Sequence, residues 1–213
     1  PHVLWWNRVT PVFCDIEPES CNLDPEQIER LIGPETKAIM PVHVYGNPCQ
    51  VEAIQRIADR HGLHVIYDAA HAFGVRQAGR PLAGSGDLSM LSFHATKLYS
   101  TIEGGAIVAS SAAQKKRIDF LKNFGIANEE TVIGPGINGK LNELQAAYGL
   151  LALENIDEEI ARRRRLAERY RLGLEGLDGV RMLQPGPDVE PNRAYLPVLI
   201  DAAAFGIDRD ALY

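Results

Sequence analysis

The stretch between residues 63 and 109 constrains the fold of this chain most strongly. Leu63 to Tyr67 is a near-continuous apolar run, which is typical of a strand covered on both faces of a parallel sheet. Leu88 to Phe93 and Ala106 to Ala109 are further apolar runs without a long helix between them, and they predict strands in a hairpin-like pair. We therefore expect the centre of a sheet here.

The residues before this stretch alternate between strand-like and helix-like patterns. Val9 to Phe13 predicts a short strand, and Asp24 followed by Pro is a typical helix start. Residues 37–44 predict a second strand, and residues 48–60 predict a helix that ends at Gly62. This rhythm predicts an α/β fold with a mostly parallel sheet flanked by helices.

The character of the chain changes after Ser111. We expect a large α/β domain over residues 1–155 and the start of a smaller C-terminal α+β domain over residues 156–213. The pattern predicts helices at 111–124, 141–153 and 157–177, a loop at 128–139, and strands at 179–183 and 193–200.

Charge and composition exclude several classes of function. The net charge of −6 argues against a nonspecific nucleic-acid binder, and the basic run Arg162 to Arg165 lies among acids, as on a solvated helix face. No apolar run approaches the roughly 20 residues that span a bilayer. We therefore expect neither a nucleic-acid partner nor a membrane partner.

The cysteines and the two ends of the chain carry further expectations. Cys14, Cys21 and Cys49 are odd in number and lack the spacing of metal ligands, so we expect reduced thiols, no metal site and a cytoplasmic protein. The chain starts at Pro1 without an initiator Met, and a helix has only begun at Tyr213. We expect a piece of a longer protein.

Three chemically active side chains follow predicted strands. Asp68, Ser92 and Lys97 come at or just after two apolar runs, and ligands of open α/β sheets bind at the carboxyl ends of the strands. A carboxylate, a hydroxyl and a partly desolvated amine are what pyridoxal phosphate requires, as partners for its ring nitrogen, its phosphate and its carbonyl carbon.

Simpler interpretations of the same residues stay open. An Asp after a strand is commonly a turn or helix cap, and a Lys is commonly a surface residue. Gly104-Gly105 fits a tight turn as well as a phosphate-binding turn. No G-x-G-x-x-G motif and no P-loop is present, so a nucleotide-binding interpretation has no motif to support it.

Several motifs together resemble a known family. The segments DAAHAFG at 68–74, SFHATK at 92–97, EGGAIVAS at 103–110 and GINGKLNELQAAYGLLALENID at 136–157 are similar to the DegT/DnrJ/EryC1/StrS sugar aminotransferases. Residues 10–29 and 41–48 are similar to that family too. The resemblance implies the fold of type I pyridoxal-phosphate transferases, with a seven-stranded, mostly parallel sheet, a smaller C-terminal domain and a homodimer.

The resemblance also implies roles for single residues. Lys97 would bind pyridoxal 5'-phosphate covalently and shuttle the proton, and Asp68 would pair with the pyridine nitrogen. His71 would lie near the ring and its phenolic oxygen, although a satisfied core histidine is the alternative. Ser92 would bind the phosphate, and Asn138 would reach the phosphate of the neighbouring subunit. Weaker candidates, for which core roles are equally open, are His43, His94 and Tyr99.

The implied reaction moves an amino group from an amino acid, glutamate being the expected donor, to a nucleotide-linked 4-keto or 3-keto 6-deoxysugar. The alternatives are a dehydratase of the same family, which has histidine in place of the lysine at position 97, and a noncatalytic ligand-binding regulator, which needs neither Lys97 nor Asp68. The family's N-terminal phosphate loop and ring-stacking aromatic have no counterpart in this sequence, so the site within it is incomplete.

Overall fold

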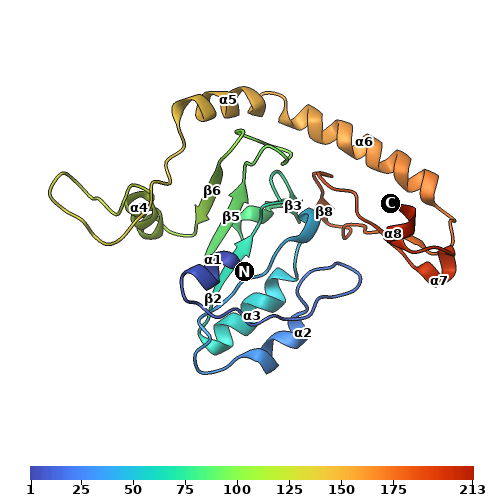
Figure 1. The fold of residues 1–213 in the computed structure, drawn as a ribbon, viewed down its shortest axis with the longest axis horizontal. Helices are drawn as coiled ribbons and strands as arrows, with labels where there is room; N and C mark the ends of the chain where they lie inside the picture. The colour runs from blue at the N-terminus through green and yellow to red at the C-terminus, as the bar shows by residue number, and fades with distance from the viewer.

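A computed structural model describes residues 1–213 and has an α/β architecture (Figure 1). The main sheet has four strands in the order β1-β2-β5-β6, where the family resemblance implied seven. Its strands are β1 (Ala38–Ile39), β2 (His64–Asp68), β5 (Leu88–Ser92) and β6 (Gly105–Ala109). β1, β2 and β5 are parallel, and β6 pairs antiparallel with β5. The mostly parallel sheet and the hairpin-like pair are confirmed.

The hydrophobic core lies between the sheet and helix α3 (Val51–His61). Ile54 and Ala58 of the helix and Val65 and Tyr67 of β2 are completely buried. Burial of apolar surface of this kind is the main favourable contribution to the free energy of folding. The helix ends where the sequence predicts, because Gly62 adopts the left-handed conformation (φ 63°) that suits a C-terminal cap. Packing in the core thus fixes the position of β2 and of Asp68, the last residue of this strand.

The N-terminal residues differ from the prediction. Residues 9–13 form no strand, and Val12 and Phe13 are exposed. No neighbouring strand is available to pair with them, so the apolar pattern has no sheet to join. Helix α1 (His2–Trp6) precedes this segment, and α2 (Pro25–Ile28) follows it with Asp24 as the predicted cap.

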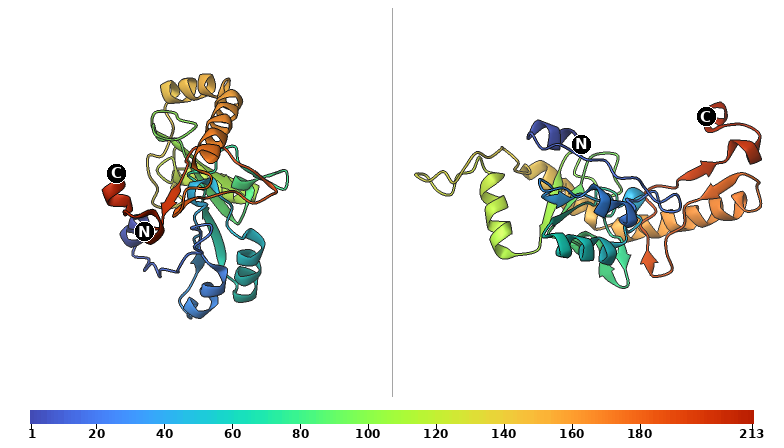
Figure 2. Two further views of the ribbon diagram at one scale, coloured as in Figure 1. Left: turned by 90° about the vertical axis from the view of Figure 1, so that its right-hand side faces the viewer. Right: turned by 90° about the horizontal axis from the view of Figure 1, so that it is seen from below.

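Helices α4 (Ala112–Leu121), α5 (Glu143–Leu153) and α6 (Ile156–Leu174) follow the sheet. Figures 1 and 2 show α5 and α6 running along one side of the molecule as an arch, while α4 and the loop after it project away from the sheet. Leu144, Leu150 and Leu151 of α5 are exposed by 84, 67 and 63%. The α5 surface is therefore apolar and largely uncovered.

The C-terminal residues contribute strands to two small sheets. β7 (Val180–Met182) and β9 (Val198–Ile200) pair antiparallel with each other. β8 (Val189–Glu190) instead joins β3 (Arg76–Gln77), which also pairs with β4 (Arg80–Pro81). The chain after α6 thus returns to the strand region that follows Asp68. The remaining elements are η1 (Glu29–Leu31), η2 (Val44–Gly46), η3 (Leu82–Gly84), α7 (Ala202–Phe205) and α8 (Arg209–Leu212).

None of the helices combines the length and the apolar character that crossing a bilayer requires. The thiols of Cys14, Cys21 and Cys49 are all free.

Candidate active site

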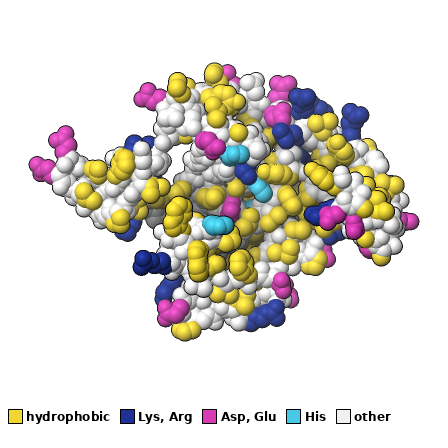
Figure 3. Space-filling model, in the orientation of Figure 1, with side chains coloured by type: hydrophobic (Ala, Val, Ile, Leu, Met, Phe, Trp, Pro, Cys, Tyr) yellow, Lys and Arg dark blue, Asp and Glu magenta, His cyan; other side chains and the backbone are white.

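Two neighbouring parallel strands bring the predicted site residues together. Asp68 is the last residue of β2, and its register partner on β5 is Met90, two residues before Ser92. Lys97 lies in the turn that follows β5, where its backbone N–H donates to the His94 carbonyl at 2.9 Å. The carboxylate, the hydroxyl and the amine therefore lie at one edge of the sheet, as predicted. Histidine, basic and acidic side chains gather near the middle of the face drawn in Figure 3.

Asp68 is held by hydrogen bonds on both sides of its backbone. Its N–H donates to the Pro41 carbonyl at 2.9 Å, and its carbonyl accepts from the His43 N–H at 3.0 Å. Its Oδ1 atom accepts from the Ala70 N–H at 3.0 Å. Asp68 is therefore the cap of the turn after β2, and its second oxygen, Oδ2, makes no protein hydrogen bond. The capping interpretation and a ligand-binding role are compatible here.

His71 is oriented by the backbone of Tyr45. The Tyr45 N–H donates to His71 Nδ1 at 3.1 Å, and Tyr45 has the left-handed conformation (φ 57°, ψ 15°), which is uncommon for a residue other than glycine. Because Nδ1 accepts this bond, the neutral ring carries its proton on Nε2. Burial lowers the pKa of His71, the positive charge of Lys97 lowers it further, and the Asp68 carboxylate acts in the opposite direction. His71 thus presents an Nε2–H donor near neutral pH.

Lys97 is half-buried, and its amine meets a tyrosine from the C-terminal part of the chain. Nζ donates to the Tyr195 phenolic oxygen at 3.4 Å, and it lies 5.9 Å from the centre of the Tyr195 ring. The amine is therefore not a free surface group, which was the simpler interpretation of this lysine.

Ser92 and the glycine pair occupy the same turn region. Ser92 Oγ accepts weakly from the His94 N–H at 3.4 Å, so its hydroxyl proton is available to a ligand. Opposite it lies Gly105, where a Cβ atom would approach the Leu91 carbonyl oxygen to 2.7 Å. Gly105 is thus required for close approach of two strands, as in the tight-turn interpretation.

Asn138 lies apart from these residues. It is exposed in the loop before α5, its Oδ1 accepts from Lys140 Nζ at 2.8 Å, and its backbone forms an isolated bridge with Asn123. Within the chain, Asn138 does not join the Asp68–Lys97 edge. Its expected role toward a neighbouring subunit stays a prediction.

The weaker candidates divide between surface and core. His94 is exposed, and its ring bonds with Thr96 at 2.9 Å. Tyr99 is buried in an aromatic cluster with Phe73 and Phe93. His43 is completely buried, stacks on Tyr67 at 4.5 Å, and has its pKa lowered to about 4 by burial.

Sequence reasoning missed Tyr45, Asn192 and Tyr195 at this edge. The His71 ring lies 6.1 Å from the Tyr45 ring and 4.4 Å from the Tyr195 ring, centre to centre. Asn192 donates to the His71 and Phe73 carbonyls at 2.9 Å each. Tyr195 lies 98 residues after Lys97 in the sequence, and no local pattern marks it. Tyr45 alone had a local signal, as the residue before a turn glycine.

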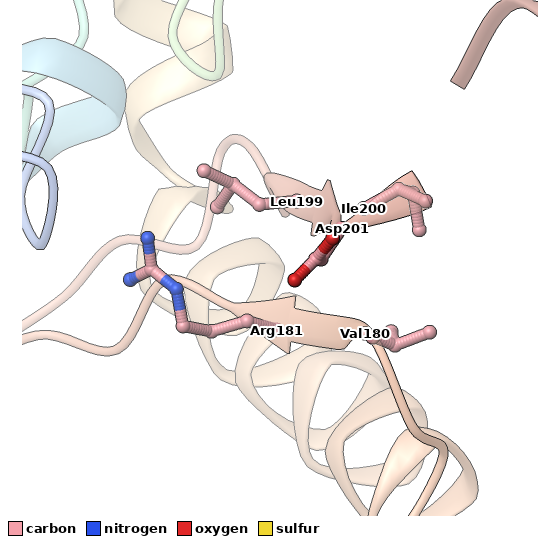
Figure 4. Close-up of a pocket in the computed structure, with 6 residues that line it drawn as sticks. Val180, Arg181, Leu199, Ile200 and Asp201 are labelled. Carbon is pink, nitrogen blue, oxygen red and sulfur yellow. The ribbon is translucent and has the colours of Figure 1, made fainter. Parts of the chain in front are cut away.

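A separate hollow of about 420 Å³ lies at β7 and β9. Figure 4 shows Arg181 on β7 and Asp201 directly after β9, both lining this hollow. None of the predicted site residues lines this hollow, so the Asp68–Lys97 edge stays the candidate active site.

Comparison with known proteins decides the family. Residues 2–213 match the model of the DegT/DnrJ/EryC1/StrS aminotransferase family. The chain belongs to this family. A relative from Escherichia coli, dTDP-4-amino-4,6-dideoxy-D-glucose transaminase, is 46% identical over 217 residues, which cover all of this chain and 57% of that protein. A relative from Streptomyces venezuelae, dTDP-3-amino-3,4,6-trideoxy-alpha-D-glucose transaminase, is 36% identical over 85% of this chain and 48% of that protein.

Two solved structures are also similar to this chain. The structure of DesI in the presence of its TDP-sugar product superposes with a TM-score of 0.94 and 42% identity, over all of this chain and 54% of that one. The structure of S. venezuelae DesV with a ketimine intermediate gives a TM-score of 0.87 at 35% identity, over 96% of this chain and 54% of that one. The chain spans about half the length of the relatives it matches.

Proposed function

We propose that the full-length protein is a pyridoxal-phosphate-dependent transaminase that moves an amino group from an amino acid, glutamate being the expected donor, to the keto group of a nucleotide-linked 6-deoxysugar. The observation that carries the proposal is the half-buried Lys97 amine at the same sheet edge as the Asp68 carboxylate. The names of the E. coli and S. venezuelae relatives support a 4-keto or a 3-keto sugar.

The residues at the edge fit the proposed cofactor. Asp68 keeps Oδ2 free to hold a protonated ring nitrogen, and the His71 Nε2–H is a donor suited to the phenolic oxygen. The Ser92 hydroxyl can donate to the phosphate. Lys97 supplies the amine that attaches to the carbonyl carbon. When bound, the cofactor supplies an electron sink that stabilises negative charge on the substrate α-carbon.

Asp68 and Lys97 would have separate roles in the proposed reaction. Asp68 would accept a hydrogen bond from the protonated ring nitrogen and so favour the cationic form of the ring. Lys97 Nζ would serve as the base that takes a proton from the substrate carbon and then, as the acid, would give the same proton to the carbonyl-derived carbon of the cofactor. The lysine at position 97 favours transamination over the dehydratase alternative, in which histidine replaces it. A noncatalytic binding protein has no need to keep both Lys97 and Asp68.

The proposal also covers the oligomeric state, the domain boundary and the location of the protein. We propose a homodimer in which Asn138 reaches the cofactor phosphate of the partner, and the exposed apolar surface of α5 supports it. We also propose a division near residue 155 into a large and a small domain, and a cytoplasmic location.

Absorbance and mass spectrometry test the main proposal. The full-length protein purified with pyridoxal phosphate is expected to show a visible absorbance band, and borohydride treatment should leave the cofactor mass on the peptide that contains Lys97. Lys97→Ala should show no such peptide. Addition of glutamate should convert the band to that of the pyridoxamine form. No band at saturating cofactor in the wild-type protein would overturn the proposal.

A further inference from the structure

A segment of the C-terminal part is fixed against the candidate active site by Asn192. This side chain is 1% exposed, and its amide nitrogen donates to the backbone carbonyls of His71 and Phe73 at 2.9 Å each. Its Oδ1 accepts from the Ala194 N–H at 2.9 Å. Every hydrogen atom of the amide group and its oxygen are therefore in use, so the segment has one well-defined position relative to His71.

Two further features hold the same segment. Arg164 Nε of α6 donates to the Pro191 carbonyl at 2.7 Å, and Arg163 donates to the Ala194 carbonyl at 3.4 Å. On the other side lies Gly46, where a Cβ atom would approach the His71 carbonyl oxygen to 2.8 Å and Asn192 Oδ1 to 3.4 Å. The segment is thus clamped between α6 and the loops that follow β1 and β2.

Tyr195 extends from this clamped segment to the two reactive side chains. Its ring centre lies 4.4 Å from that of His71 and 5.8 Å from that of Tyr45. Its phenolic oxygen accepts from Lys97 Nζ at 3.4 Å, and this is its only side-chain hydrogen bond in the structure. The ring packs against His71, and the hydroxyl group adds the contact with Lys97.

We propose that Tyr195 is a positioning residue that restrains the Lys97 amine through its phenolic oxygen and the His71 ring through its aromatic face. Lysine has a long flexible side chain with three equivalent donors, and a fixed acceptor selects the conformations in which Nζ lies at the Asp68 edge. A residue of the C-terminal part thereby restricts the position of the Lys97 amine, which follows a strand of the central sheet. The consequence for catalysis rests on the proposed function, whereas the restraint on Lys97 does not.

The test is the reactivity of Lys97 in the full-length, cofactor-free protein. Tyr195→Phe removes the acceptor and keeps the ring. An amine-acylating reagent is applied at pH 8, and modification of Lys97 is measured by mass spectrometry relative to the exposed Lys37. Loss of one long hydrogen bond, at the low end of the usual net strength, is expected to speed Lys97 labelling about threefold. Tyr170→Phe, at an exposed tyrosine of α6, is the matched control and should leave the rate unchanged.

The outcomes separate this proposal from the proposed function. An equal or slower labelling rate in Tyr195→Phe overturns the positioning role, even where pyridoxal phosphate binds normally to the wild type. Faster labelling together with no cofactor band in the wild type retains the positioning role and overturns the proposed function. Where both hold, Tyr195→Phe should also lower kcat more than it changes KM for the amino donor and shift the pH profile of kcat, which a merely structural residue would not do.

Discussion

The sheet edge at Asp68 and the arm formed by α5 and the loop before it are opposite kinds of surface. At the edge, Asp68 and His71 are each held by backbone hydrogen bonds, and the strand below them is buried. In the arm, Asn138 is exposed and Leu150 is 67% exposed. The side chains of the edge are held by contacts within the chain, whereas those of the arm are largely exposed. The predictions below test this difference.

The largest effect is expected at the edge, from the loss of the Lys97 amine. Lys97→Arg keeps the positive charge but cannot attach to a carbonyl carbon, so transaminase activity should fall by about 10³-fold or more. The measurement is turnover of glutamate with a keto-sugar nucleotide by the full-length protein. Lys37→Arg, at an exposed lysine, should retain wild-type activity. Activity in Lys97→Arg within tenfold of wild type would contradict the role of this residue.

Two large-to-small substitutions compare the core beneath the edge with the arm. Ile54→Ala removes a completely buried side chain and should lower the free energy of unfolding by about 3 kcal/mol. Leu150→Ala should change it by less than about 0.5 kcal/mol at low protein concentration, because the side chain is already exposed.

Denaturant unfolding at several protein concentrations provides the measurement for both variants. A cost of Leu150→Ala that grows with concentration would show that a second copy covers α5. If Ile54→Ala and Leu150→Ala lowered the free energy of unfolding equally at the lowest concentration, the proposed difference between the buried core and the exposed arm would be wrong.

Acid should weaken the edge through His43. Burial lowers its pKa from 6.5 in the unfolded chain to about 4 in the folded protein, so between these values the unfolded chain binds the proton that the folded protein excludes. Stability is therefore present in full above pH 6.5 and is lost as the pH falls toward 4. The loss between pH 7.5 and pH 5 should be about 2 kcal/mol.

The measurement is the free energy of unfolding as a function of pH in wild type and His43→Asn. The variant keeps a side-chain acceptor near the Cys49 N–H but has no titrating ring, so its slope should be smaller. The same slope in both proteins would assign the acid sensitivity to other groups.

The smallest effect is expected in the arm. If Asn138 reaches the cofactor phosphate of a partner subunit, Asn138→Ala should weaken cofactor affinity about tenfold, the loss of one hydrogen bond to a charged group. Asn128→Ala, in the same loop, is the control and should bind like the wild type. The measurement is a fluorescence titration of the cofactor-free, full-length protein. Equal affinities of the two variants would leave Asn138 without this role.

Local signals were sufficient for much of the fold. The apolar spacing and Gly62 predicted α3 and its end, because a helix and its cap are determined within a few residues. The run at 63–67 predicted β2, but burial alternates along the strand, and only Val65 and Tyr67 are completely buried. Residues 9–13 have a similar pattern but no neighbouring strand, and sheet formation depends on that partner.

The candidate site was predictable only in part, for the same reason. Asp68, Ser92 and Lys97 come at strand ends, so the topology of a parallel sheet brings them to one edge. Tyr195 reaches Lys97 from a segment in which Asn192 pairs with two carbonyls about 120 residues earlier in the chain. Such a contact depends on tertiary packing that no local pattern encodes.

The long separation between Asn192 and its partners affects the order of events during synthesis. The two carbonyl groups that accept from Asn192 emerge from the ribosome about 120 residues before it, which at typical translation rates is on the order of ten seconds. During that interval the nascent chain presents the lysine and the histidine without the tyrosine that later covers them. Tyr195 can thus contact Lys97 only after residues 192–195 have been synthesised.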